Sequence, residues 1–204
     1  MPLVGDKSTI DRDSYLASSE FIDWKHPEIL KVAQTLSQGK KTPVAVAKSC
    51  FEYVRDEIKH SSDYRLNPVT CKASDVFKHQ TGFCYAKSHL LAALLRANTL
   101  PAGLCYQRLT IENSVPPYCL HGLNAVYLPE QGWYRMDARG NKEGVMADFT
   151  PPLEKLAFPI TVEGEVDFQE IWPEPLAEVI RLLESSTHYQ QVLEKLPDSE
   201  ILYL

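Results

Sequence analysis

The first half of the chain repeats apolar residues with the spacing of an α-helix. This period runs over about residues 27–36, where Pro27 suits the first position of a helix. A second helix is predicted after Thr42, a residue type that caps helices, followed by Pro43. A third helix is predicted over residues 85–98, where apolar residues form one stripe. We expect this third helix to be central in the core, with its N-terminus at a cleft.

The pattern changes between and after these helices. Residues 59–72 are polar and predict a loop, and residues 74–77 predict one helical turn. Beyond residue 98, strand-forming residues predict three strands, at 104–111, 121–128 and 133–138. Helices followed by adjacent antiparallel strands indicate an α+β fold, in which the central helix packs on an antiparallel sheet.

The connections between the strands decide which residues share a face of the sheet. The first connection is predicted as a loop over residues 112–117. His121 and Asp137 lie on the two strands of the second hairpin, and side chains alternate between faces along each strand. The two residues share a face if Leu128 pairs with Gly132 across a three-residue loop, where glycine accepts a bulged turn. A four-residue loop would put them on opposite faces.

Prolines become frequent after residue 141, and the character of the chain changes there. Helical spacing resumes over about residues 176–196. We therefore predict a single domain over residues 1–204, with a core at about 27–141 and a C-terminal wrap of extended chain and helices at 142–204. A length of 204 residues is sufficient for one sizeable core.

Composition and charge narrow the class of protein. The chain is 44% hydrophobic and 24% charged, which is typical of a soluble globular domain. Its net charge of −6 leaves no basic surface for nucleic acid. No apolar stretch approaches the roughly 20 residues of a membrane span, and the first residues lack an apolar signal segment. We expect a cytoplasmic protein without a nucleic-acid or membrane partner, and the oligomeric state stays open.

Three residues, in the order cysteine, histidine and aspartate, carry the candidate chemistry. Cys84 follows Gly82-Phe83 at the start of the central helix, where unpaired N–H groups and partial positive charge favour a thiolate. His121 and Asp137 follow as its base and the residue that orients the base, an arrangement able to perform acyl transfer. The Cys84 N–H group and the side-chain amide of Gln80 are candidate donors to an oxyanion.

Each of these residues also has a purely structural alternative. Taken singly, Cys84 fits a buried inert thiol, His121 a structural histidine and Asp137 a turn cap. The odd number of cysteines, without paired spacing, predicts reduced thiols. Cys119 and His121 are spaced like half of a zinc site, but no second ligand pair accompanies them, so neither a metal nor a cofactor is predicted. His89 lies about 140° around the helix from Cys84 and points away from it.

A resemblance to a known family covers about residues 40–140. The segments that carry it are Thr81-Gly82-Phe83-Cys84-Tyr85-Ala86-Lys87-Ser88, residues 91–97, Leu100-Pro101-Ala102-Gly103, and His121 through Trp133 to Asp137. Together they resemble the transglutaminase-like superfamily, which shares the papain-like cysteine-protease fold. The resemblance implies that Cys84 attacks a carboxamide or peptide carbonyl, that His121 accepts and returns the proton, and that Asp137 holds the imidazole.

The chain also departs from the family pattern. The family usually continues its aspartate with proline and threonine, whereas Asp137 here precedes Ala138-Arg139-Gly140. This departure places the chain in a divergent microbial branch and weighs against protein crosslinking, the activity that gives the family its name.

The leading hypothesis is a cysteine-dependent enzyme that acts on a peptide, protein or small amide substrate. A thioester at Cys84 would be resolved by water or by an amine, and the sequence leaves both acceptors open. A catalytically silent binding module of the same fold is one alternative. An acyl-CoA-dependent amine acetyltransferase is another, but its motif has an arginine and paired glycines before the cysteine, whereas this chain has Gln80-Thr81-Gly82.

Overall fold

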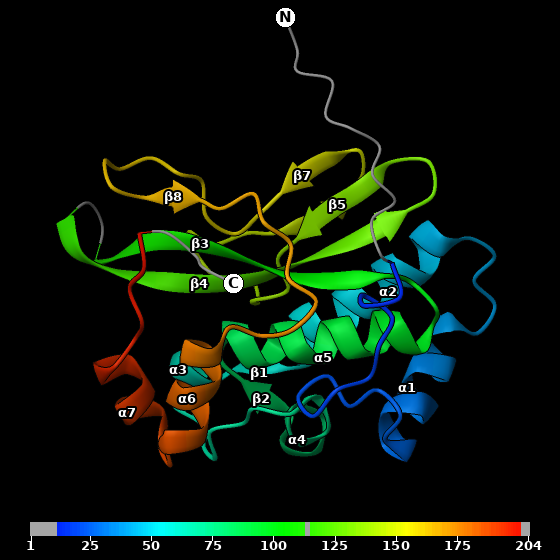
Figure 1. Ribbon diagram of the computed structural model, residues 1–204, viewed down its shortest axis with the longest axis horizontal. Helices are drawn as coiled ribbons and strands as arrows, with labels where there is room; N and C mark the ends of the chain where they lie inside the picture. Colours follow the sequence, from blue (N-terminus) through cyan, green and yellow to red (C-terminus); the bar gives the residue numbers. More distant parts are fainter. Residues whose placement is uncertain (1–11, 113–114, 201–204) are drawn as a thin grey trace, which may run out of the picture.

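The computed structural model describes residues 12–112 and 115–200 of the chain. Helices form one layer of the molecule and an antiparallel sheet forms the other (Figure 1). The sheet has the strand order β5-β4-β3-β8, made of Gly132–Met136, Val115–Leu128, Ala102–Glu112 and Val166–Asp167. The helix layer contains α1 (Pro27–Ser37), α2 (Pro43–Asp56), α4 (Ala73–His79) and α5 (Cys84–Ala97). The α+β fold predicted from the order of the elements is confirmed.

Shorter elements complete the fold. They are β1 (Lys59–His60), α3 (Ser61–Tyr64), β2 (Thr81–Gly82), β6 (Asp148–Thr150), β7 (Leu153–Lys155), α6 (Ala177–Ser185) and α7 (Tyr189–Glu194). Strands β6 and β7 form a separate antiparallel pair, whereas β1 and β2 pair in parallel. Within the described residues, no helix has both the length and the apolar character needed to cross a membrane.

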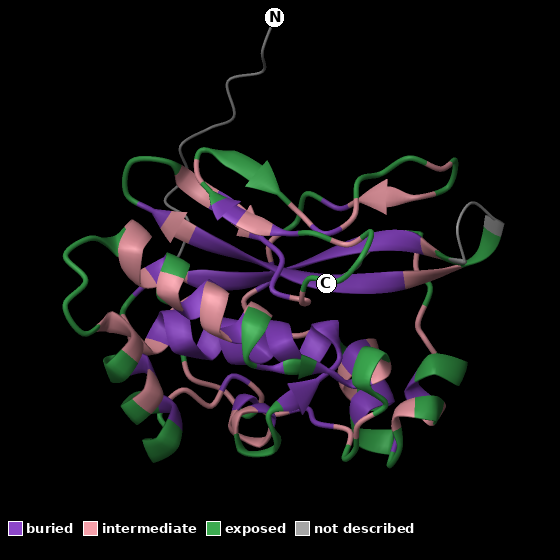
Figure 2. Cartoon of the chain, turned by 180° about the vertical axis from the view of Figure 1, so that it is seen from behind, coloured by how far each residue is buried: buried purple, intermediate pink, exposed green. Residues whose placement is uncertain are grey.

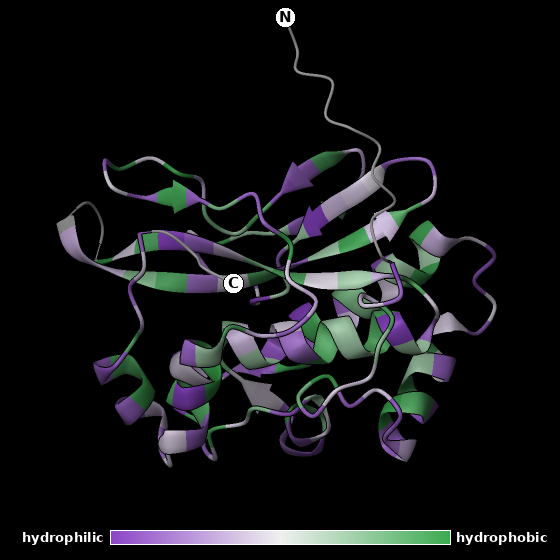
Figure 3. Ribbon diagram, in the orientation of Figure 1, coloured by the Kyte–Doolittle hydropathy of each residue, from purple (hydrophilic) through white to green (hydrophobic). Residues whose placement is uncertain are grey.

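The first two helices begin where the sequence predicts them. Pro27 and Pro43 lie in the first turns of α1 and α2. The hydroxyl of Thr42 caps α2 by accepting a hydrogen bond from the Ala45 N–H group at 3.2 Å. Both helices are amphipathic and pack on α5, with polar residues on their outer sides (Figure 3). They therefore form a second wall around α5, next to the wall made by the sheet.

Helix α5 is enclosed on every side, rather than along the single apolar stripe that we predicted. Every residue from Cys84 to Arg96 is buried, and the helix lies between the sheet and the other helices (Figures 1 and 2). A helix that is surrounded by protein need not be polar on any face. The start of α5 contacts β4 at Gly122, where a Cβ atom would lie 3.2 Å from the Cα atom of Tyr85. The absence of a side chain at this position brings helix and strand together.

The second hairpin has the register that the triad hypothesis requires. Leu128 pairs with Gly132, which has a positive φ of 76°. The first hairpin differs from the prediction, because β4 begins at Val115, inside the predicted loop over 112–117. The two strands stay paired up to Thr110 and Tyr118 and shift register just beyond, so the connection is shorter than the proline-rich sequence suggested.

The predicted loop over residues 59–72 is also only partly correct. It contains β1 and α3, and α4 is longer than the single turn predicted at 74–77. In the β1–β2 pair, His60 lies beside Gly82, two residues before Cys84. A two-residue strand is too short to show a hydrophobic period, which is why the sequence pattern missed it.

The C-terminal segment returns to the sheet after two helices, which the sequence pattern had combined into one helical stretch. The backbone N–H group of Leu120 donates to the Pro197 carbonyl oxygen at 2.8 Å. Arg108 on β3 pairs with Asp198, with an Nη2–Oδ2 distance of 2.8 Å. These contacts place the residues around Leu196 against β3 and β4.

Candidate active site

Cys84 is the first residue of α5 and lines a cavity of about 680 Å³. Its exposed fraction is 9%, so it lies at the wall of the cavity rather than on the outer surface. Phe83 precedes the helix in an extended conformation, and no side chain caps the helix end from that position. The first N–H groups of the helix therefore need other partners, and they create partial positive charge beside the thiol.

His121 and Asp137 form a buried pair on the sheet. His121 lies on β4, and Asp137 directly follows β5. The His121 Nε2 atom lies 2.7 Å from the Asp137 Oδ2 atom. The exposed fraction is 5% for His121 and 0% for Asp137, so water competes little for this bond. The two side chains share a face of the sheet, as the hairpin argument required.

The Asp137 carboxylate is fixed by two further donors. The backbone N–H group of Arg139 donates to Oδ1 at 3.0 Å, and that of Ala157 donates to Oδ2 at 3.2 Å. Burial alone would raise the pKa of Asp137, but the charge of His121 and these hydrogen bonds hold it below its usual value. Asp137 is therefore a carboxylate at neutral pH.

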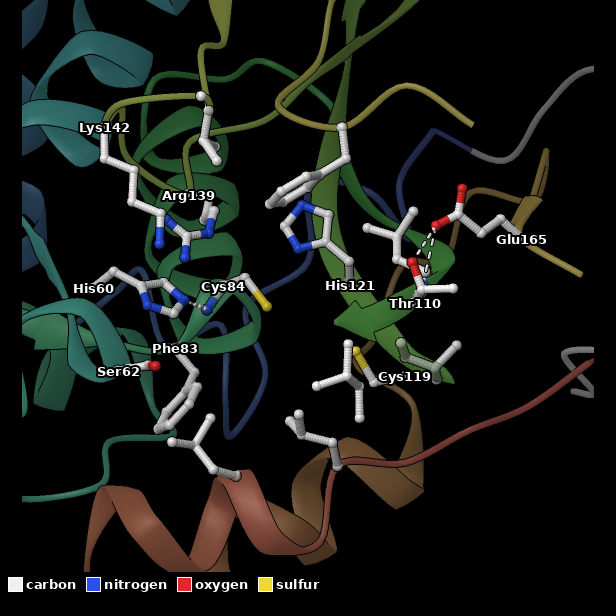
Figure 4. A pocket seen from close by; sticks show the side chains of 18 of the residues that line it. His60, Ser62, Phe83, Cys84, Thr110, Cys119, His121, Arg139, Lys142 and Glu165 are labelled. Carbon is white, nitrogen blue, oxygen red and sulfur yellow. Dashed lines mark hydrogen bonds between the residues drawn. The ribbon is translucent and has the colours of Figure 1, made fainter. Parts of the chain in front are cut away.

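The imidazole of His121 is shared between Asp137 and Cys84. Burial disfavours its charged form, but the Asp137 charge and the interactions with Cys84 prevail and raise the pKa of His121 to about 10. Because Nε2 is bonded to Asp137, Nδ1 is the nitrogen left for the thiol. Figure 4 shows Cys84 and His121 at the same cavity.

Phe158 holds the His121 ring from another direction. The two rings meet edge to face, with centroids 5.0 Å apart and an interplanar angle of 84°. The guanidinium of Arg139 in turn lies 5.8 Å from the centroid of Phe158. This packing limits rotation of the imidazole and keeps its Nε2 atom on the side of Asp137.

The structure thus brings Cys84, His121 and Asp137 together on α5, β4 and the end of β5. A family model described as the transglutaminase-like superfamily matches residues 30–138, more than half of the chain. The chain belongs to this superfamily. The matched region contains all three residues together with the helix and strands that position them.

Solved structures resemble this transglutaminase-like chain in fold. A candidate cysteine protease from Cytophaga hutchinsonii is 18% identical, with a TM-score of 0.51, and the match covers 68% of this chain and 45% of that protein. The periplasmic domain of TgpA from Pseudomonas aeruginosa is 24% identical, with a TM-score of 0.47 and coverage of 64% and 48%. The chain spans less than half the length of either structure. No curated protein sequence matches it.

Gln80 lies apart from the other candidate residues of this transglutaminase-like chain. It ends α4 in the left-handed conformation, with a φ of 53°, and it is exposed and absent from the cavity wall. Its side-chain amide donates to the Phe77 carbonyl oxygen. The structure therefore contradicts the oxyanion role predicted for Gln80, because the left-handed turn directs the amide back to α4.

His60, rather than Gln80, contacts the start of α5. Its Nε2 atom accepts a hydrogen bond from the Cys84 backbone N–H group at 3.2 Å. Burial, reinforced by the positive charge of Arg139, holds the pKa of His60 well below its usual value, so the ring is neutral at neutral pH. Sequence reasoning missed His60 because it lies in a polar stretch with no motif or period to mark it.

A cluster of charged side chains borders the His60 ring. Asp63 accepts hydrogen bonds from the two terminal nitrogens of Arg139, at 2.6 and 3.0 Å, and from Lys142 at 2.8 Å. Its Oδ2 atom lies 3.9 Å from His60 Nδ1. Arg139 and Lys142 also line the cavity, so one end of the cavity is polar and charged (Figure 4).

Segments outside the matched region complete the cavity. Phe158, Val162 and Glu165 come from the extended chain after β7, whereas Leu193 and Leu196 come from α7 and the residues after it. A large part of the wall is apolar and consists of Phe83, Leu109, Ile111, Cys119, Leu120, Val162, Leu193 and Leu196. The superfamily core therefore carries the candidate triad, and later segments shape the space beside it.

The other four cysteines differ from Cys84 in their surroundings. All five cysteines are free thiols. Burial raises the pKa of the other four, Cys50, Cys71, Cys105 and Cys119, to about 12. Within residues 12–112 and 115–200, no three His, Cys, Asp or Glu side chains are grouped to hold a metal ion.

We predict that limited iodoacetamide treatment at neutral pH modifies Cys84 first. The other thiols stay protonated, whereas Cys84 has a helix N-terminus and the His121 imidazole beside it. Peptide mapping by mass spectrometry measures the order of modification. Cys119→Ser is the matched control, because Cys119 lines the same cavity, and it should leave the Cys84 rate unchanged. Preferential modification of Cys119 would contradict the assignment.

Proposed function

We propose that this chain is a cysteine-dependent enzyme that hydrolyses or transfers the acyl group of a peptide, protein or small amide. The observation that carries the proposal is the 2.7 Å bond between His121 and Asp137, with the other imidazole nitrogen left for Cys84. Membership of the transglutaminase-like superfamily and the fold shared with a candidate cysteine protease support a cysteine-based enzyme.

The first half-reaction forms a thioester. His121 takes the thiol proton on Nδ1 while Asp137 stabilises the imidazolium through Nε2. The Cys84 sulfur attacks the carbonyl carbon, a C–S bond forms, and the carbonyl π electrons move to oxygen. When this intermediate collapses, the C–N bond breaks, and the imidazolium gives its proton to the leaving amine.

The second half-reaction releases the acyl group. Water or an amine attacks the thioester carbon, and neutral His121 accepts the proton of the attacking group. The C–S bond then breaks and the Cys84 thiolate is restored beside the imidazolium. Both acceptors fit this sequence of steps.

Single-turnover acylation tests the proposed roles of Cys84 and Asp137. Cys84→Ala should abolish formation of the acyl-enzyme with the fold intact, because the removed sulfur lines a cavity. Asp137→Ala should still acylate slowly, because the carboxylate only fixes and stabilises the imidazole. Mass spectrometry of the intact protein, after mixing with an amide or activated ester, detects the adduct. Acylation that persists in Cys84→Ala would show that another residue is the nucleophile. If the wild type turns over no amide, the result would favour the catalytically silent binding module.

Amide acylation should fall as pH rises through about 10, the pKa of His121. The imidazolium, present below that pH, protonates the leaving amine and disappears above it. In Asp137→Asn this decline should move to lower pH, because the Asp137 charge is the main factor that raises the pKa of His121. Alkylation by iodoacetamide is the control, since it needs no proton donor and should show no such decline. A wild-type profile that stays level through this range would contradict the acid role of His121.

The apolar wall of the cavity favours acyl donors with an apolar side chain. Ile111 and Leu193 line the cavity and are 44% and 41% exposed, so part of the wall is available to a ligand. Covering such side chains with an aliphatic or aromatic group removes apolar surface from water. A charged group at the same position would lose water without gaining a partner.

Donors with leucine or phenylalanine beside the reacting carbonyl should therefore be preferred over those with aspartate or lysine. Leu193→Asn should reduce kcat/KM for the leucine donor by about tenfold, the effect of losing one buried aliphatic contact. Leu30→Asn is the matched control, because Leu30 is a 40% exposed leucine of α1 outside the cavity wall. Equal effects of the two substitutions would contradict a role of this wall in substrate choice.

A further inference from the structure

The backbone N–H group of Cys84 already has a hydrogen-bond partner. At the start of a helix, the N–H group of a nucleophile is well placed to stabilise an oxyanion. Here it donates to His60 Nε2 at 3.2 Å. A carbonyl oxygen that approaches the Cys84 sulfur must take this donor from His60. The His60 Nε2 atom therefore borders the position where negative charge would develop.

The hydrogen bonds of His60 do not permanently fix which of its two ring nitrogens carries the proton. Because Nε2 accepts a bond in the structure, the neutral ring carries its proton on Nδ1. Yet Nδ1 is buried and has no hydrogen-bond partner within the described part of the chain. The nearby Asp63 carboxylate, 3.9 Å away, is beyond hydrogen-bond reach and is already bonded to Arg139 and Lys142. Moving the proton away from Nδ1 therefore breaks no hydrogen bond.

We propose that His60 is a catalytic residue that donates an N–H group to the substrate oxyanion. When the carbonyl oxygen takes the place of Nε2 at the Cys84 N–H group, the neutral ring is present as its other tautomer, with the proton on Nε2 and none on Nδ1, so the ring neither gains nor loses a proton overall. The oxyanion then accepts two hydrogen bonds, one from the Cys84 N–H group and one from His60 Nε2–H. This role depends on the proposed function of Cys84.

A neutral imidazole suits this role in a buried site. A neutral imidazole N–H group can polarise a carbonyl oxygen without carrying a charge of its own. Burial is the main factor that lowers the pKa of His60, and the positive charge of Arg139 lowers it further. The Asp63 carboxylate opposes this shift without reversing it. Burial and the balance of these charges therefore leave His60 a neutral donor beside a developing anion.

Packing holds the His60 ring in place. Phe83 meets it edge to face, with ring centroids 5.5 Å apart. The β1–β2 pair fixes the His60 backbone beside Gly82. Lys87, on the first turn of α5, donates to the carbonyl oxygen of Ile58, two residues before His60. These contacts tie the ring to the same turn of helix that carries the sulfur.

Two reagents separate an oxyanion donor from a residue that only positions the thiol. p-Nitrophenyl acetate acylates a thiolate through a tetrahedral intermediate that carries an oxyanion. Iodoacetamide alkylates the same thiolate by direct displacement at carbon, with no oxyanion. Only a group that stabilises the oxyanion affects the first rate without the second.

The test variant is His60→Phe, which keeps an aromatic ring against Phe83 but has no N–H group. Acylation of Cys84 by p-nitrophenyl acetate should become about 100-fold slower, as when one oxyanion donor is lost. Alkylation by iodoacetamide should keep the wild-type rate. His60→Gln should recover much of the acylation rate, because its amide can both accept and donate. Thermal unfolding of each variant shows whether it is folded. If phenylalanine disturbs the fold, His60→Leu, which also lacks an N–H group, replaces it and should show the same loss of acylation rate.

Three outcomes would overturn the inference. Equal slowing of both reactions would make His60 a positioning residue for the thiol, and no slowing of either would give it no role. A wild-type Cys84 that reacts with neither reagent would overturn this inference and the proposed function together. Failure of the proposed function alone looks different, because the wild type would then react with both reagents, with the predicted His60 effect, and turn over no amide.

Discussion

The contact between the start of α5 and β4 is the constraint on which the site depends. A Cβ atom at Gly122 would lie 3.0 Å from the ring and 3.2 Å from the Cα atom of Tyr85, so only glycine allows this approach without displacement. The Tyr85 hydroxyl also donates to the Leu120 carbonyl oxygen, which ties the same turn of helix to the same stretch of strand. Because Cys84 precedes Tyr85 and His121 precedes Gly122, one backbone contact sets the spacing of sulfur and imidazole.

The polar residues of α5 fix the helix in its enclosure. A buried polar group is costly unless it is hydrogen-bonded, and each of these side chains bonds to a backbone carbonyl. The Arg96 guanidinium donates to the Ala102 carbonyl at the start of β3, and His89 Nδ1 lies 2.8 Å from the Cys71 carbonyl oxygen. Lys87 is so deeply buried that its pKa falls to about 7. These directional bonds add to the apolar packing in specifying how α5 is rotated about its axis.

The sequence was most informative where the structure repeats a period over many residues. The helices α1, α2 and α5, and the pairing of Leu128 with Gly132, follow from helical spacing and from the alternation of faces along a strand. The single-stripe description of α5 was too narrow, since a spacing pattern cannot show how many neighbours a helix has. No sequence pattern marks His60, for a related reason. Its place beside Cys84 depends on a hydrogen bond between residues 24 positions apart and on the pairing of a two-residue strand.

The residues around the cavity differ in how freely they can be substituted. Cys84, His121 and Asp137 are buried, and the last two are hydrogen-bonded to each other, so few substitutions there preserve the geometry. Leu193 and Ile111 are partly exposed, and substitutions at such positions typically change the free energy of unfolding by only about 0.5 kcal/mol. The wall can therefore diversify among related chains while Cys84, His121 and Asp137 stay unchanged. A scaffold organised in this way can change the shape of its cavity through mutational drift without disturbing the contacts that hold its core together.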